Sequence, residues 1–493
     1  MKTKIILSLL AGSLLFSTTS CDLDSKVYSS FAETNFPQTE EDARSMITGL
    51  YAYFKCNSGG VNDDSNGVWA LPLYSPGYGG WLGISEMTTD EVYNREHQEV
   101  QFNWGSAFDT YSTYTLSRNI TRATYILQVI NNLTDIPEEV KKELIAEVKC
   151  LRGWLMFCFY DLYGPIPVVL DPAELDGEIK YKPRPSKEEY FNYMIKDLTE
   201  ALPDLYDKTN NTSNWGRVNK GLATMLLMKL YMNDHQYDKA LPYAESLTQM
   251  GYRLLDNYND IFSEEQNEEV IWAVPSGEQM ANEWFFYVIP PDCSEVCGME
   301  VTPYWGVTVM PWDFYDSYTE GDKRKEGLSD HYTGPDGTFY SRDGNPGAVL
   351  SYGAIIVKYF IPKEEASKGD VPFVAFRYAD VLLSLAEIEN ELNGPTNKAL
   401  DYLKQITDRA GVTHSIPTDI QSSKEKFKEF LLAERGRELY FEGWRRQDMI
   451  RFDKYIEYGL SKGFPAKDHM VLFPIPPQVI IESGGIVEQN PGY

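Results

Sequence analysis

Residues 222–247 read LATMLLMKLYMNDHQYDKALPYAESL, and this stretch decides the fold class. Residues 222–232 are almost entirely apolar, which predicts a helix that is buried on most of its sides. The polar run 233–236 breaks that helix. In residues 237–247, Ala240, Ala244 and Leu247 then recur at helical spacing. They predict a second, amphipathic helix, and the small alanines let it pack closely on the first.

A helix, a short turn and a second helix with these offsets resemble a tetratricopeptide unit. Residues 381–392, the turn 393–396 and the apolar positions in residues 399–406 indicate a second unit. The long stretch between the two units excludes a regular solenoid, whose repeats stack without interruption. We therefore expect a mainly α fold, with a tetratricopeptide-like helical scaffold that carries long loop and small-strand insertions.

An apolar stripe upstream predicts a further helix with one buried face. The stripe consists of Leu144, Val148, Leu151, Leu155, Cys158 and Leu162, and it stops at Gly164. Residues 57–105, 256–375 and 461–493 lack such periodicity and hold many Gly, Pro and aromatic residues. We interpret them as insertions, and long irregular segments on a rigid scaffold commonly carry binding sites.

The composition narrows the classes of partner. The chain has 493 residues and a formal net charge of −28. Such a charge repels nucleic acid and anionic lipid surfaces, so neither is expected as a partner. Aromatic residues make up 14% of the chain, with 34 Tyr and 10 Trp. Tyr and Trp suit half-exposed binding surfaces because each joins an apolar face to a polar edge.

The N-terminus predicts export and lipid anchoring. Lys2 and Lys4 precede a short apolar stretch, residues 5–16, and small residues then lead to Cys21. This order predicts a signal peptide over residues 1–20 and acylation of Cys21, although an ordinary cleaved signal with an incidental cysteine is the alternative. No later apolar run is long enough to span a bilayer. We expect residues 21–493 to form a single domain.

The remaining cysteines and the acidic segment 62–67 define neither a complete set of disulfides nor a metal site. Five cysteines follow Cys21, and this odd number argues against a complete disulfide framework, although Cys293 and Cys297 could form a local bridge. Residues 62–67 resemble the first half of a calcium loop, but Leu73 occupies the position where an EF-hand needs Glu. We interpret this segment as a polar turn, and we expect no cofactor and no metal site, with a calcium site of a type other than the EF-hand as the alternative.

Several motifs, in a fixed order along the chain, are similar to signatures of the SusD/RagB family. They are CFYDLYGPIP (158–167), GRVNKGLA (216–223), FRYADVLL (376–383), ERGREL (434–439), PIP (474–476) and QNPGY (489–493). Each motif is weak alone, but their common order across the predicted mature chain is specific.

The resemblance implies a lipid-anchored protein on the surface of the outer membrane of a Bacteroidetes-type bacterium. It implies a partner, a TonB-dependent transporter of the SusC type, and a ligand, an oligosaccharide or polysaccharide captured for import. Some relatives are associated with peptides instead, so a peptide-binding protein of the RagB kind remains the alternative.

Aromatic residues in the insertions are the candidate ligand contacts, because flat rings pack on the apolar faces of sugars. The candidates are Trp69, Tyr74, Tyr78, Trp81, Trp284, Tyr304, Trp305 and Trp312. Trp81 and Trp305 are the preferred pair, and Asn66, Asp90 and Glu91 are candidate polar partners because they lie close by in sequence. The competing interpretation is that these rings anchor their loops to the scaffold.

Catalytic signatures are absent from the sequence, which holds no His-Glu-x-x-His motif and no Gly-x-Ser-x-Gly elbow. A glycosidase needs only two suitably spaced carboxylates, so that alternative stays open, as does an adaptor without a small ligand. We interpret the charged signature residues as a partly buried network that fixes helix packing. These residues are Glu434, Arg435, Arg437, Glu438, Glu442, Arg446 and Asp448. We therefore expect a binding protein and not an enzyme.

Overall fold

The structure is a computed structural model that describes residues 37–57, 61–63, 68–77, 79–96, 102–104, 111–175, 181–277, 282–359, 371–412 and 416–493. The predicted signal peptide and Cys21 lie outside these residues. Among the described residues, no helix has both the length and the apolar character needed to cross a membrane.

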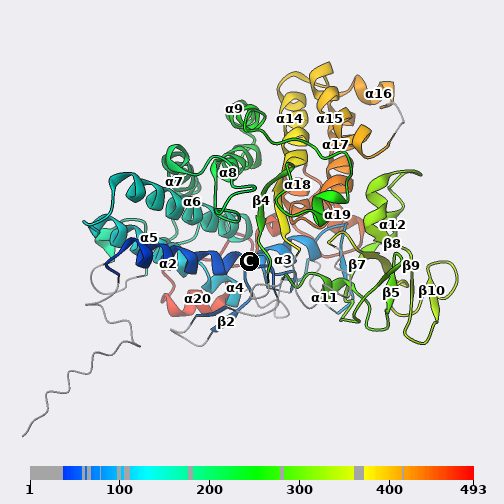
Figure 1. Ribbon diagram of the computed structural model, residues 1–493, viewed down its shortest axis with the longest axis horizontal. Helices are drawn as coiled ribbons and strands as arrows, with labels where there is room; N and C mark the ends of the chain where they lie inside the picture. Colours follow the sequence, from blue (N-terminus) through cyan, green and yellow to red (C-terminus); the bar gives the residue numbers. More distant parts are fainter. Residues whose placement is uncertain are drawn as a thin grey trace, which may run out of the picture.

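A helical scaffold forms most of the upper side of the molecule (Figure 1). Its helices are α5 (Arg118–Asn132), α6 (Glu138–Tyr163), α7 (Lys187–Ala201), α8 (Lys220–Asn233), α9 (Tyr237–Leu247), α14 (Tyr378–Asn393), α15 (Asn397–Arg409) and α17 (Lys424–Leu439). Successive helices pack side by side, including α5 on α6, α6 on α7 and α8 on α9. The expected mainly α, tetratricopeptide-like fold is confirmed.

Both predicted helix–turn–helix units are present, as α8–α9 and α14–α15. The Asn219 side chain caps α8 by accepting the Leu222 amide at 2.9 Å, and Thr396 caps α15 in the same way. Helix α9 packs directly on α14, so the two units are neighbours in space although a long insertion separates them in sequence. The scaffold is therefore continuous across the insertion.

The apolar stripe predicted upstream lies on α6, where all six of its side chains are fully buried. The helix ends at Gly164, which has a φ of 70°. Glycine adopts this left-handed conformation without the steric penalty that a side chain would bring. The chain can therefore turn sharply into the proline segment that follows.

The insertions fold into small antiparallel sheets. Their strands, in order within each sheet, are β1 (Val61–Asp63) and β2 (Val68–Ala70); β10 (Phe339–Ser341), β9 (His331–Thr333), β5 (Glu295–Val296) and β6 (Met299–Glu300); β3 (Tyr93–Asn94), β7 (Thr308–Pro311), β11 (Gly353–Ile356) and β8 (Leu328–Ser329); β12 (Phe373–Arg377) and β4 (Val270–Val274). Strand β3 belongs to the first insertion and pairs with β7 of the second. The two insertions thus meet in one sheet.

Short helices complete the described structure. They are α2 (Glu40–Tyr51), α3 (Trp81–Met87), α4 (Tyr111–Thr115), α10 (Asp260–Ser263), α11 (Phe285–Val288), α12 (Trp312–Tyr315), α16 (Thr418–Gln421), α18 (Arg445–Arg451), α19 (Tyr455–Ser461) and α20 (Pro477–Glu482), with 3-10 turns at Ala52–Phe54, Pro172–Glu174, Leu202–Asp204, Lys323–Gly327 and Asp468–Val471. Helix α11 lies at the lower side of the molecule, below the scaffold (Figure 1).

Candidate functional site

Helix α11 and the loop before β7 form an aromatic surface. The Phe286 ring packs on Tyr304, with ring centres 4.3 Å apart. The Trp305 amide donates a hydrogen bond of 3.0 Å to the Phe286 carbonyl, which ties the loop to the helix. Trp305 itself stays 53% exposed. The structure therefore presents a large aromatic ring to solvent on a fixed backbone.

Tyr287 supports the Trp305 ring from one side. The two rings meet edge to face, with centres 5.2 Å apart and an angle of 85° between their planes. This arrangement is favourable for aromatic pairs. Burial raises the pKa of Tyr287 to about 12, so its hydroxyl stays protonated at neutral pH and can donate a hydrogen bond.

The first insertion packs beneath this surface at Gly77. A Cβ atom on Gly77 would lie 2.6 Å from the Tyr287 hydroxyl oxygen. The Glu283 amide also donates to the Cys56 carbonyl at 2.9 Å. The two aromatic insertions therefore meet at Tyr287.

Trp81, one of the two preferred candidates, lies in the core with no exposed surface. Its Nε1 donates to the Asp161 carboxylate at 2.8 Å, and its ring centre lies 5.5 Å from that of Trp444. Tyr74 is likewise fully buried, and Trp284 is 3% exposed. A sugar-stacking role does not fit these positions, because the neighbouring side chains already cover the rings.

The other described candidates are half-buried. Tyr304 contributes to the surface through its contact with Phe286. One face of Trp312 is covered by the Arg342 guanidinium, 4.2 Å from the ring centre, and its Nε1 donates to the Leu350 carbonyl at 2.9 Å. These contacts make Trp312 a loop anchor that keeps some exposed surface.

Two candidate polar partners are not available to a ligand, and three other candidates lie wholly or partly outside the described residues. Glu91 is 1% exposed and Asp90 is held by Arg445 in a two-point ion pair, with both N–O distances 2.7 Å. Asn66 and Tyr78 lie outside the described residues, as does the side chain of Trp69 and most of the segment 62–67. Nothing structural is assigned to these residues.

The sequence interpretation missed Tyr93, which lies in β3, and Arg95 and Tyr352, which directly adjoin β3 and β11 of the same sheet. Tyr93 and Tyr352 stack nearly parallel, with ring centres 5.5 Å apart, and Tyr352 is 44% exposed. Each tyrosine stands alone in the sequence, so neither forms an aromatic cluster there. The alternation of Tyr93 and Arg95 at strand spacing was the available signal.

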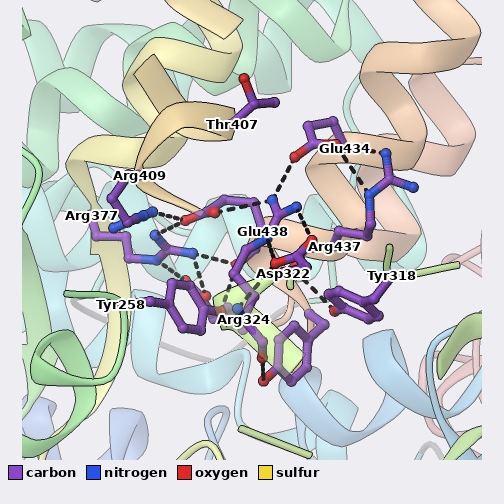
Figure 2. Close-up of polar contacts among 12 residues, drawn as sticks. Tyr258, Tyr318, Asp322, Arg324, Arg377, Thr407, Arg409, Glu434, Arg437 and Glu438 are labelled. Carbon is purple, nitrogen blue, oxygen red and sulfur yellow. Dashed lines mark hydrogen bonds and ion pairs between the residues drawn. The ribbon is translucent and has the colours of Figure 1, made fainter. Parts of the chain in front are cut away.

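The charged signature residues form a buried network, as the sequence predicted (Figure 2). Arg377 bonds Glu438 at 2.5 Å, Glu269 at 2.9 Å and Glu442 at 2.8 Å, and all four side chains are at most 1% exposed. Arg435 pairs with Asp380 and Asp448, both at 2.8 Å. These groups hold α14, α17 and α18 together and have no access to a ligand.

The described cysteines are free thiols, so Cys293 and Cys297 do not form a disulfide in this structure. Within the described ranges, no group of three or more His, Cys, Asp or Glu residues has the geometry to hold a metal ion.

Comparison with known proteins supports the sequence resemblance. A family model described as the SusD family matches residues 314–493. A SusD-like protein of Formosa agariphila is 26% identical over 485 residues, which cover 89% of this chain and 88% of that protein. The starch-binding protein SusD of Bacteroides thetaiotaomicron is 22% identical over 488 residues, covering 84% of this chain and 85% of that protein.

Solved structures share the fold. A surface glycan-binding protein A from Bacteroides thetaiotaomicron, in complex with laminarihexaose, superposes with a TM-score of 0.72 at 18% identity, covering 91% of this chain and 99% of that chain. A SusD superfamily protein from Parabacteroides distasonis superposes with a TM-score of 0.73 at 21% identity, covering 93% of this chain and all of that chain.

Proposed function

Because this chain belongs to the SusD/RagB family, we propose that it is a surface glycan-binding protein that captures an oligosaccharide for import. The observation that carries the proposal is Trp305, a ring that is 53% exposed yet fixed by α11 and Tyr287. An exposed ring of this kind can stack on the apolar face of a pyranose, and the Tyr287 hydroxyl can bond a sugar hydroxyl.

The location and the partner belong to the same proposal. The mature chain is anchored to the outer membrane through acylated Cys21, and it hands its ligand to a TonB-dependent transporter of the SusC type. The leader sequence and the family membership support this part. Residues 21–493 act as one domain in which the helical scaffold carries the ligand-binding insertions.

We propose binding without catalysis. The signature carboxylates are paired with arginines inside the scaffold, and the facing carboxyls of Glu86 and Glu91 are at most 2% exposed. A glycosidase must bring two carboxyl groups to the scissile bond, and these groups cannot reach a bound glycan. Turnover of an oligosaccharide by the purified protein would contradict this part of the proposal.

Trp305→Ala is the test of the binding site. We expect this variant to lose about 2 kcal/mol of binding free energy, roughly thirtyfold in affinity, since a central Trp often dominates a recognition surface. A glycan array would identify the ligand class, and calorimetry on wild type and variant would measure the loss. Laminarihexaose is the first oligosaccharide to try, because a structural neighbour was solved with it.

Tyr181→Ala is the matched control, since Tyr181 is 49% exposed and belongs neither to α11 nor to the loop before β7. It should leave affinity unchanged. If no glycan binds while a peptide library does, the protein is a peptide-binding member of the family. If a glycan binds equally well to Trp305→Ala, the aromatic surface is not its site.

A further inference from the structure

The chain leads from Trp305 into strand β7, and the neighbouring strand β3 carries Tyr93. We propose that the glycan site extends from Trp305 across Arg95 to the stacked pair Tyr93 and Tyr352 and into the cleft beyond, so that the ligand is an extended, neutral oligosaccharide. This inference rests on the proposed function and names the length and charge class of its ligand.

The pairing of strands β3 and β7 relates the position of Tyr93 to that of Trp305. Strand β3 runs beside β7, with Tyr93 opposite Val309, and the Arg95 amide donates to the Val307 carbonyl at 2.7 Å. Val309 is four residues from Trp305, and the chain turns between them at Gly306, which has a φ of 54°. Trp305 and Tyr93 are then contacted by different sugar units of one ligand.

Arg95 joins the two positions. Its Nε donates to the Gly306 carbonyl at 3.0 Å and its Nη1 to the Ala348 carbonyl at 3.1 Å. The side chain thus fastens the loop that carries Trp305 to the loop that leads to Tyr352. The two aromatic steps are held in one fixed relation, which suits a ligand that contacts both at once.

Tyr93 also lines a cleft of about 500 Å³. Phe314, Tyr458 and Phe464 supply apolar wall, and each charged group that lines the cleft is paired with a group of opposite charge, including Arg437 with Glu434 at 2.6 Å. Asp90 pairs with Arg445, and Asp313 pairs with Lys462 at 3.0 Å. Ligand clefts combine apolar walls with a few polar groups in this way.

The charges in the cleft favour a neutral sugar. The Asp313 side chain is 88% exposed and its partner Lys462 is 46% exposed, so acceptors and donors are both available at the rim. Sugar hydroxyls use both kinds of partner. An anionic sugar would meet Asp313 and a protein whose formal net charge is −28.

Oligosaccharides of two lengths test whether the site extends to Tyr352. We would measure affinity for the disaccharide and the hexasaccharide of the neutral glycan identified on the array, using wild type and Tyr352→Ala. We expect Tyr352→Ala to weaken the hexasaccharide about tenfold and to leave the disaccharide unchanged. Trp305→Ala should weaken both. Asp313→Ala, at the rim of the cleft, should weaken the hexasaccharide about threefold.

Tyr125→Ala is the matched control, because Tyr125 is 45% exposed and Tyr352 is 44% exposed. If Tyr352→Ala binds the hexasaccharide as wild type does while Trp305→Ala does not, the extension is wrong and the proposed function stands. If Tyr352→Ala weakens binding of the disaccharide as much as binding of the hexasaccharide, Trp305 and Tyr352 do not contact separate parts of the ligand. Stronger binding of an oligogalacturonide would overturn the neutral class, and no glycan binding by wild type would overturn both proposals.

Discussion

Arg377→Met is expected to lower the free energy of unfolding by about 3–5 kcal/mol, because it removes a shared cation from three buried carboxylates. Arg377 has no exposed surface and bonds the side chains of Glu269, Glu438 and Glu442. Methionine matches much of its volume but supplies no charge. Denaturant unfolding at neutral pH, followed by circular dichroism, would measure the loss.

The network can compensate only in part. Glu438 keeps Arg409 and Arg324, and Glu442 keeps Lys358, after Arg377 is removed. Burial opposes ionisation of Glu438, yet Arg409, Arg377 and Arg324 together hold its pKa well below the ordinary value. Loss of one of these cations raises that pKa and the cost of keeping the carboxylate ionised.

Arg342→Met is the control for the Arg377 experiment. Arg342 also makes a two-point pair with a carboxylate, at 2.6 and 2.7 Å from Asp316, but its side chain is 32% exposed. Exposed pairs contribute at most about 1 kcal/mol, because water and salt screen them. Similar losses for the two variants would show that the contribution of the signature network to the free energy of unfolding does not depend on its burial.

The helical scaffold could be predicted because its signals are local. The stripe on α6 and the two helix–turn–helix units follow from apolar spacing within single segments. The contact between α9 and α14 could not be predicted, because it depends on how a long insertion leaves the scaffold and returns. The paired strands β4 and β12 make that return, and no local pattern specifies their partner.

Of the two aromatic residues preferred from the sequence, only Trp305 lies on the surface. Trp81 and Trp305 both stand among small residues and aromatics, yet Trp81 has no exposed surface and Trp305 is 53% exposed. Asp161 and Trp444, both distant in sequence, decide the burial of Trp81. The residues that follow Trp81 in α3 are buried all round, and the helical spacing of Trp81, Ile84 and Met87 was the available signal.

A second large effect is expected from Glu91→Gln, which should stabilise the protein at neutral and alkaline pH. Glu86 and Glu91 are 2% and 1% exposed, their two carboxyls interact directly, and the Oε2 atom of each lacks a donor, so that one proton shared between the carboxyls would satisfy both oxygens. One oxygen of each carboxyl accepts a hydrogen bond from a backbone amide in the turn that follows α17. Gly443 donates to Glu86, and Phe441 donates to Glu91 at 3.1 Å.

The pKa shifts of the two carboxyls determine how the free energy of unfolding changes with pH. Burial raises the pKa of Glu86 to about 7, from an ordinary value of 4.5, and raises the pKa of Glu91 well above that value. The folded state therefore keeps protons that the unfolded state releases above pH 4.5, and stability falls as the pH rises from there through about 7. The side-chain amide that Glu91→Gln introduces carries its own donor and removes much of this loss.

We expect Glu91→Gln to match wild type near pH 4.5 and to exceed it by about 1–3 kcal/mol at pH 8. Denaturant unfolding at several pH values between these limits would measure the difference. A loss of stability at every pH would mean that the two carboxyls do not share a proton.

The double variant Glu86→Gln/Glu91→Gln separates proton sharing from simple removal of charge. A backbone amide already occupies one oxygen of each side chain, so two glutamines would turn their NH₂ groups toward each other. A buried donor without an acceptor costs about 1–3 kcal/mol, so the double variant should lose the gain of the single one. Glu86 and Glu91 attach the first insertion to the turn at Gly443, so protonation of this pair couples pH to the contact between that turn and the insertion that packs on Tyr287.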